Sequence, residues 1–225
     1  MGTIGVEWAN KFHGRAQDLK NNDDNAQGFA NTLQGIKRFD WGDDVAWDQD
    51  FEQSGTGSPS SGTDQLWADS VDIAFYSGHG NIDGGFFGIA NLDDGIARPS
   101  NIRLGDQNCE WVVFDACEVL KDDGNVFGRC RQMFTGLHYV LGFHTTCGDS
   151  GDRGRIFAER LNAGDRVRDA WIHACTETEG SDTWLAYMRA DAAGTDTFND
   201  HWWGKGFTST DPSNPTIRFY LKTSC

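Results

Sequence analysis

Hydrophobic residues in this chain gather in short uninterrupted runs, with longer and more polar segments between them. Three runs, at 71–76, 111–114 and 139–143, hold four to six mostly apolar, β-branched or aromatic residues. Runs of this length that close at Gly or a polar residue are typical of strands buried on both faces. Residues 3–8 predict a further strand at the start of the chain.

Between these runs, apolar residues recur at positions i, i+3, i+4 and i+7, which is the period of one helix face. The first such face has Asp23 or Asp24 as its expected N-cap and Gly35 as its expected stop. The predicted helices lie at 26–33, 126–134, 152–163 and 165–174. Strands that alternate with helices form parallel units. The pattern therefore predicts one α/β domain over residues 1–225, with a mainly parallel sheet and helices on both faces.

Other segments have weaker signals. Residues 38–63 are rich in Gly, Ser and Asp, and we interpret them as a surface excursion, either a flexible loop or a substrate lid. Residues 83–89 predict a small hairpin that leads into a polar loop at 91–105. Beyond residue 180 the pattern fades, and 184–188 and 216–221 predict two late strands around a loop at 201–204.

Composition narrows the classes of partner. The net charge of −15, from 34 acidic and 19 basic residues, disfavours binding to a nucleic acid or to an anionic membrane. No apolar run is long enough to cross a bilayer. The six cysteines include no CxxC pair, and the first residues lack a secretory signal pattern. We therefore expect reduced thiols and favour the cytoplasm; an exported protein would instead allow one or two disulfides.

The clearest candidate chemistry follows two of the buried runs. The first ends at Ser77-Gly78-His79-Gly80 and the second at Asp115-Ala116-Cys117-Glu118. Since ligands of open α/β sheets bind beyond the carboxyl ends of the strands, His79 and Cys117 are expected at one edge. An imidazole can activate a thiol, and the backbone N–H of Gly80 can stabilise an oxyanion. The alternative is that Cys117 is a small core residue.

Further polar residues admit more than one interpretation. His144 and Cys147 follow the third run, so they could join His79 and Cys117 as zinc ligands. The spacing of these four residues is irregular for a zinc site. We expect His144 to line the pocket instead. Asp115 is a candidate for substrate binding or for orienting a loop, and otherwise caps a turn. The acidic runs at 21–25 and 93–94 read as solvated surface in preference to calcium sites. We expect no metal and no cofactor.

Two motifs, Phe75-Tyr76-Ser77-Gly78-His79-Gly80 and Val112-Val113-Phe114-Asp115-Ala116-Cys117, resemble the His-Gly and Asp/Gln-Ala-Cys blocks of caspase-like cysteine peptidases. This clan CD group includes caspases, metacaspases, legumain, gingipains and clostripain. The resemblance covers about residues 3–176. It implies a three-layer αβα fold, Cys117 as nucleophile, His79 as general acid/base, and an oxyanion hole formed by the N–H groups of Gly80 and Cys117.

The resemblance does not carry over in every position. In caspases, a loop after the first strand supplies a basic residue to the substrate pocket. The comparable loop of this chain contains Lys11, His13 and Arg15, and no motif selects one of them. Glu118-Val119 stands where caspases have Arg-Gly, so specificity for Asp is not inherited. We therefore expect a Cys–His hydrolase acting on a peptide or on a small amide or ester. A biosynthetic enzyme with the same dyad and an inactive binding domain remain alternatives, and the oligomeric state is open.

Overall fold

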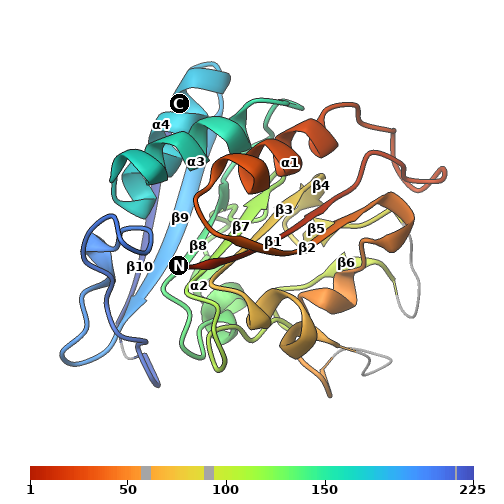
Figure 1. Ribbon diagram of the computed structural model, residues 1–225. Coiled ribbons are helices and arrows are strands. Elements are labelled where there is room, and N and C mark those ends of the chain that lie inside the picture. Colours follow the sequence, from red (N-terminus) through yellow and green to blue (C-terminus); the bar gives the residue numbers. More distant parts are fainter. Residues whose placement is uncertain (57–61, 89–93, 216) are drawn as a thin grey trace.

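Seven strands form the main sheet, in the order β10-β9-β8-β7-β3-β1-β2 (Figure 1). This computed structural model describes residues 1–56, 62–88, 94–215 and 217–225. The strands are β1 (Thr3–Trp8), β2 (Ile36–Gly42), β3 (Ile73–Ser77), β7 (Trp111–Asp115), β8 (Tyr139–Phe143), β9 (Trp184–Asp191) and β10 (Ile217–Ser224). The pairs among β2, β1, β3, β7 and β8 are parallel, and β8–β9 and β9–β10 are antiparallel. The predicted mainly parallel α/β fold is confirmed.

Three α-helices cover one face of this sheet (Figure 1). They are α1 (Asn22–Thr32), α3 (Arg153–Ala163) and α4 (Val167–Thr178). Phe29 of α1 stacks on Phe75 of β3 with ring centroids 4.7 Å apart, and on Phe157 of α3 at 5.6 Å. All three rings are fully buried, and each contributes about 1.5–3 kcal/mol by leaving water. This aromatic contact fixes α1 and α3 over the centre of the sheet.

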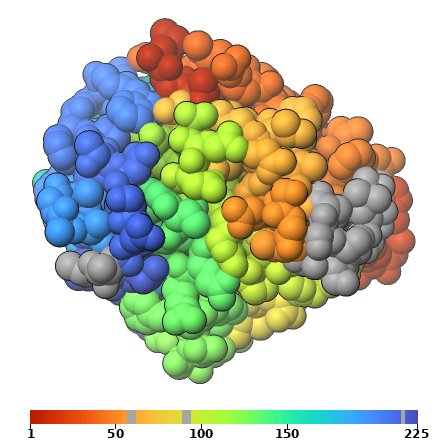
Figure 2. Space-filling view, turned by 90° about the horizontal axis from the view of Figure 1, so that it is seen from below, coloured from red at the N-terminus to blue at the C-terminus, as the bar shows by residue number. Residues whose placement is uncertain are grey.

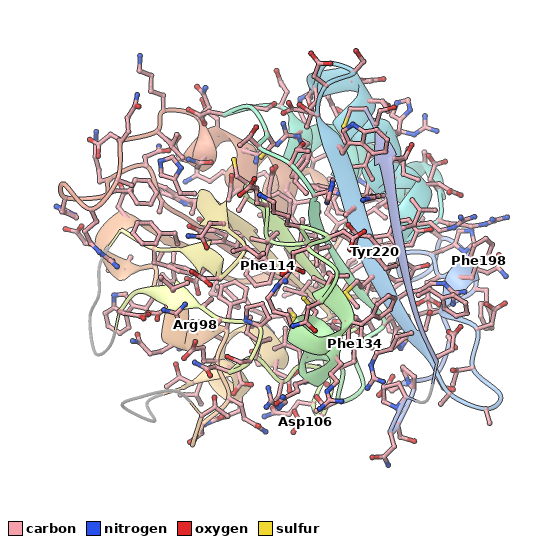
Figure 3. The ribbon with its side chains drawn as sticks, turned by 180° about the vertical axis from the view of Figure 1, so that it is seen from behind. Arg98, Asp106, Phe114, Phe134, Phe198 and Tyr220 are labelled. Atoms are coloured by element: carbon pink, nitrogen blue, oxygen red, sulfur yellow. The ribbon has the colours of Figure 1, made fainter. Side chains whose placement is uncertain are left out.

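Shorter elements cover the opposite face, which Figure 2 shows from below. They are α2 (Val126–Cys130), a small antiparallel sheet of β4 (His79–Asn81), β5 (Gly84–Phe86) and β6 (Ile96–Ala97), and the 3₁₀ helices η1 (Asp43–Val45), η2 (Asp48–Asp50), η3 (Asp64–Leu66), η4 (Ala68–Ser70) and η5 (Arg131–Met133). The core under them includes Phe114 and Phe134, with Tyr220 of β10 packed against it (Figure 3). A last 3₁₀ helix, η6 (Thr197–Asn199), follows β9. Helices therefore lie on both faces, as predicted.

Strand β2 is the main element that the sequence pattern does not predict. Its first residues fall just before the segment interpreted as a surface excursion, and its last ones fall inside it. Because β2 is an edge strand, only Phe39 of its side chains is buried, and no apolar run marks it. The excursion therefore begins after Gly42. Its residues 57–61, and residues 89–93 and 216 of other predicted segments, lie outside the described residues.

The start of α1 also differs from the prediction. The helix begins at Asn22, so Asp23 and Asp24 lie in its first turn and neither is the N-cap. Asn22 and Asn25 are only 4 % and 1 % exposed, which corrects the interpretation of residues 21–25 as solvated surface. In the part of the chain that the structure describes, no helix combines the length and the apolar character needed to span a bilayer.

Candidate active site

The carboxyl ends of β3 and β7 bring His79 and Cys117 into one pocket. Ser77, the last residue of β3, pairs with Asp115, the last residue of β7. The N–H of Gly78 donates to the carbonyl of Asp115 over 3.3 Å, so the two chains stay adjacent beyond the sheet. The pocket that follows encloses about 70 Å³, and both His79 and Cys117 line it.

Gly80 fits closely against the cysteine loop. A Cβ atom at this position would lie 2.7 Å from the Cβ of Ala116 and 2.9 Å from the carbonyl oxygen of Cys117. Real Cβ atoms do not come so close to other heavy atoms, so any side chain at position 80 would push the two loops apart. Glycine is therefore needed here for the close approach of the His79 and Cys117 segments.

The His79 ring is held by its surroundings in a defined orientation. Its Nε2 lies 2.8 Å from the carbonyl oxygen of Gln17, and the Phe12 ring lies against it with centroids 4.6 Å apart. A carbonyl only accepts, so neutral His79 carries its proton on Nε2 and donates it to Gln17. Nδ1 then keeps its lone pair and has no hydrogen-bond partner among the described residues. This tautomer is the one that can act as a base through Nδ1.

A second cysteine approaches the Cys117 sulfur. The two Sγ atoms of Cys117 and Cys147 lie 3.7 Å apart, and the N–H of Cys147 donates to the Cys117 sulfur over 3.3 Å. The side-chain hydrogen bond from Cys147 is the main cause that lowers the pKa of Cys117 to about 7, against the opposing effects of burial and of Asp115. The pKa of Cys147 is raised well above its usual range by the same contact and by burial. Cys117 is thus the thiol that ionises first.

A buried polar network forms the wall of the pocket behind the cysteine. One oxygen of Asp115 accepts from Arg153 over 2.5 Å, and the other accepts from Asn25 over 2.7 Å. Arg153 also contacts Glu179 and donates to Thr178. Burial is the main cause that raises the pKa of Asp115, while Arg153 opposes it. Asp115 therefore ties the end of β7 to α1 and α3.

The loop that carries Cys147 is tied to the segment before α1. The Asp149 carboxylate accepts from the N–H groups of Lys20 and Asn21 over 2.9 and 3.2 Å, and the Asn21 amide donates to the Asp149 carbonyl over 2.8 Å. These bonds hold one side of the pocket in place. The position of Cys147 next to Cys117 thus depends on contacts between segments that are far apart in sequence.

Other residues considered from sequence lie outside this pocket. His144 accepts at Nδ1 from the N–H of Asp122 over 2.9 Å, and so it does not line the pocket as expected. Lys11 forms a surface ion pair with Asp18, and His13 forms a hydrogen bond with Asp44. Arg15 donates to the carbonyl of Phe87 in the hairpin region. In the described ranges, no group of three or more His, Cys, Asp or Glu side chains could hold a metal ion.

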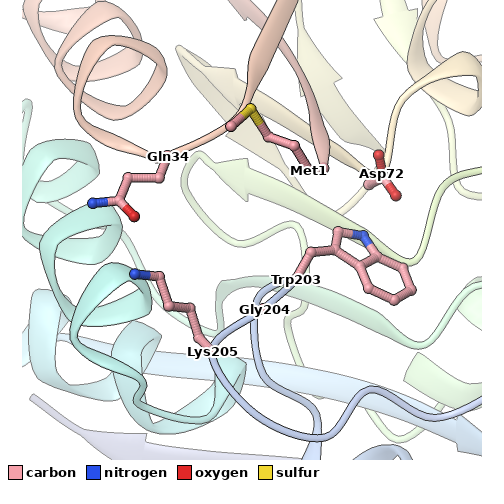
Figure 4. A pocket seen from close by; sticks show the side chains of 7 residues that line it. Met1, Gln34, Asp72, Trp203, Gly204 and Lys205 are labelled. Atoms are coloured by element: carbon pink, nitrogen blue, oxygen red, sulfur yellow. The ribbon is translucent and has the colours of Figure 1, made fainter.

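A larger cavity lies at the opposite edge of the sheet. It encloses about 530 Å³ near the amino ends of β1 and β3, and Figure 4 shows Gln34, Asp72, Trp203 and Lys205 around it. It contains neither a cysteine nor a histidine. Volume therefore does not identify the site with the most reactive side chains.

Sequence reasoning missed Arg153 and Asn25 as parts of the site. Arg153 is one of many basic residues in a helical segment, and Asn25 lies in a polar run that resembles a loop. No local pattern marks either residue as buried. The sequence places Cys147 at a strand end, where it is only a candidate zinc ligand.

Taken together, the fold and the pocket define a mainly parallel α/β protein in which Cys117 and His79 line one pocket beyond the carboxyl ends of two neighbouring strands. The chain belongs to the family described as "Domain of unknown function (DUF6345)", whose model matches residues 6–224. A search of curated proteins finds no match.

Among solved structures, the chain is similar to a secreted C11 cysteine protease from Bacteroides thetaiotaomicron, determined in complex with an irreversible peptide inhibitor. The match has 10% identity and a TM-score of 0.47, and it covers 84% of this chain and 66% of that chain. This chain thus spans just under two thirds of the length of that protease. A likeness at this level does not assign the neighbour's activity to this chain.

Proposed function

We propose that this protein is a cysteine-dependent hydrolase in which Cys117 is the nucleophile and His79 the general acid/base. The observation that supports this most is the common pocket, which is lined both by a thiol with a pKa of about 7 and by a histidine with a free Nδ1. At neutral pH about half of such a thiol is thiolate, the form that attacks a carbonyl. A core cysteine would show the opposite, a pKa raised by burial, as Cys130 does.

In the proposed reaction, the Cys117 thiolate attacks the substrate carbonyl carbon and the carbonyl electrons move onto oxygen. The backbone N–H groups of Cys117 and Gly80 are the proposed donors to this oxyanion. The N–H of Cys117 has no acceptor among the described residues, and is thus free for the role. Protonated His79 gives its proton to the leaving group as the tetrahedral intermediate collapses to a thioester. His79 then takes a proton from water, which attacks the thioester and releases the acid and the thiol.

The proposed substrates are peptides, with small amides or esters as the second class. The dyad chemistry is the same for both, because each has a carbonyl carbon and a leaving group that accepts a proton. A biosynthetic enzyme with the same dyad would release a different product, because its substrate would be a small molecule. An inactive binding domain would lack the activated thiol.

An electrophilic thiol probe tests the proposal. We expect iodoacetamide at pH 7 to label Cys117 before the other five cysteines, and His79→Ala to reduce this labelling. Cys225→Ser is the matched control, because Cys225 is partly exposed but does not line the pocket. Slow and equal labelling of all exposed thiols would refute activation and favour a binding domain. If Cys117 is selectively labelled, a peptide library screened against the wild type and Cys117→Ala then separates a peptidase from an enzyme on small molecules.

A further inference from the structure

A separate pocket of about 200 Å³ lies beside the edge strand β2, away from Cys117. It is lined by Trp41, Val45, Trp47, Asp50 and Trp67. The tryptophans at 41 and 67 pack against the core on the α2 face of the sheet, whereas α1 and α3, which border the Cys117 pocket, cover the opposite face. Four of the lining residues belong to the segment whose sequence resembles a loop or a lid. This pocket is therefore independent of the proposed active site.

Three indole rings make up most of its wall. The rings of Trp41 and Trp67 are 5.4 Å apart and nearly perpendicular, at 83°, so they form two walls of a corner. The indole N–H of Trp47 already donates to the carbonyl of Asp44 over 3.1 Å. Indole faces carry partial negative charge and attract cations within about 6 Å. The wall thus favours a positively charged ligand with a large apolar surface.

The inner end of the pocket holds a negative charge. Asp50 is only 2 % exposed and accepts from the Thr63 hydroxyl over 2.8 Å. It also shares a hydrogen bond with Glu7 of β1, which is fully buried. Burial is the main cause that raises the pKa of Asp50 to about 6, and burial and Asp50 together raise the pKa of Glu7 well above its usual range. The pKa of about 6 favours ionised Asp50 at neutral pH, and the raised pKa of Glu7 favours its protonated form.

No lysine, arginine or histidine of the described residues forms an ion pair with this carboxyl pair. A buried carboxylate without a cation is unfavourable, and a ligand that supplies the positive charge relieves that cost. The net charge of −15 also raises the local concentration of cations around the protein. The indole rings and the buried carboxyl pair therefore both favour a positively charged ligand.

We infer that this pocket binds a small quaternary ammonium compound, for which choline is the natural probe. A quaternary nitrogen has no N–H to satisfy, so methyl groups against indole rings and a nearby carboxylate suffice for recognition. Choline has seven heavy atoms, which at about 30 Å³ each, the volume of a water molecule in the liquid, need about 210 Å³, close to the roughly 200 Å³ of the pocket. A sugar would instead need several hydrogen-bond partners for its hydroxyl groups.

Calorimetric titration of the full chain with choline tests this inference, with 3,3-dimethylbutan-1-ol as the neutral ligand of the same shape. We expect saturable binding of choline, quenching of tryptophan fluorescence, and affinity for the alcohol at least tenfold weaker. Asp50→Asn removes the charge with little change of shape and should weaken choline binding at least tenfold. Val45→Lys, at a residue that is 53% exposed, should do the same through repulsion, whereas Val45→Gln should not.

The pH dependence gives a second readout. Choline binds best to ionised Asp50, so its affinity should fall as the pH drops through about 6 and should level off above 7. The titratable groups around Asp50 are Glu7 on β1, Asp48 on η2 and, beyond them, Tyr76 on β3. Equal affinity for choline and the neutral alcohol would overturn the inference, as would a lack of saturable choline binding by folded wild-type protein. Binding of methyl glycosides in place of choline would assign the pocket to sugars instead.

Discussion

The Cys147 side chain should set the reactivity of Cys117. Replacing Cys147 by Ala removes the thiol that lies 3.7 Å from the Cys117 sulfur, but it leaves the backbone N–H that donates over 3.3 Å. The side-chain hydrogen bond is the largest cause of the lowered pKa, so its loss should raise the pKa of Cys117 from about 7 to 8 or above. The remaining N–H bond still lowers the pKa, but burial, which is the larger effect, raises it, as do Asp115 and Glu118.

The size of the effect follows from the fraction of thiolate. With a pKa of about 7, half of Cys117 is ionised at pH 7, against roughly a tenth at a pKa of about 8 and a hundredth at 9. Labelling at pH 7 should therefore slow by at least about fivefold in Cys147→Ala. A thiolate of higher pKa is intrinsically somewhat more nucleophilic, which offsets part of this loss. The midpoint of the pH profile is thus a safer measure than the rate at one pH.

The assay is the rate of iodoacetamide alkylation of Cys117 between pH 5.5 and 10, followed by mass spectrometry of the peptide that contains it. The wild type should show a midpoint near pH 7, and Cys147→Ala a midpoint at least one unit higher. Cys147→Ser keeps a hydrogen-bond donor at the same position and should stay close to the wild type. The reasoning fails if the wild-type midpoint lies near 9, or if Cys147→Ala titrates like the wild type.

Three further predictions concern stability and oxidation. Arg153→Met leaves Asp115 buried without its cation and should lower the unfolding free energy by about 3–5 kcal/mol, or the Tm by roughly 6–20 °C in a thermal melt. Stoichiometric peroxide should oxidise Cys117 to a sulfenic acid, and the Cys147 thiol should then attack this sulfur and release water, which forms a disulfide. Mass spectrometry should show the disulfide as a loss of two hydrogens that dithiothreitol reverses. Cys147→Ser should prevent its formation. Burial works against protonation of His138, but the hydrogen bond to Asp200 and further acidic contacts raise its pKa to about 9. The stabilising contribution of protonated His138 is therefore complete below about pH 6.5 and disappears as the pH rises through 9. The Tm should fall over that pH window, and it should fall less in His138→Gln.

The fold was largely predictable because its central strands are buried on both faces. Runs such as 111–114 are apolar at every position, and they mark strands without any need for an alternating pattern. Strand β2 has one buried side chain among seven residues, so its burial pattern resembles that of a loop. The parallel topology then made the shared edge of His79 and Cys117 predictable, since both follow the carboxyl end of a strand.

The rest of the site depends on contacts that sequence periodicity does not encode. Arg153 and Asn25 meet Asp115 from two different helices, and each is polar at a position where a pattern search expects solvent. Their buried polar groups are satisfied by hydrogen bonds to Asp115. The position of Cys147 depends on the bonds of Asp149 to the segment before α1. Such long-range polar contacts appear only once the helices are placed.

The pairing of Cys117 with Cys147 links activation of the nucleophile to its sensitivity to oxidants. A thiol becomes a better nucleophile at neutral pH when a donor stabilises its thiolate, and here the donor is a second thiol. A hydroxyl donor would lower the pKa equally well without offering a partner for a disulfide. Oxidation of Cys117 therefore places the oxidised sulfur beside a thiol that can displace water from it and protect it from further oxidation. If the Cys147→Ser variant keeps the low pKa of Cys117 but is inactivated irreversibly by peroxide, the advantage of the second cysteine lies in this protection and not in acidity.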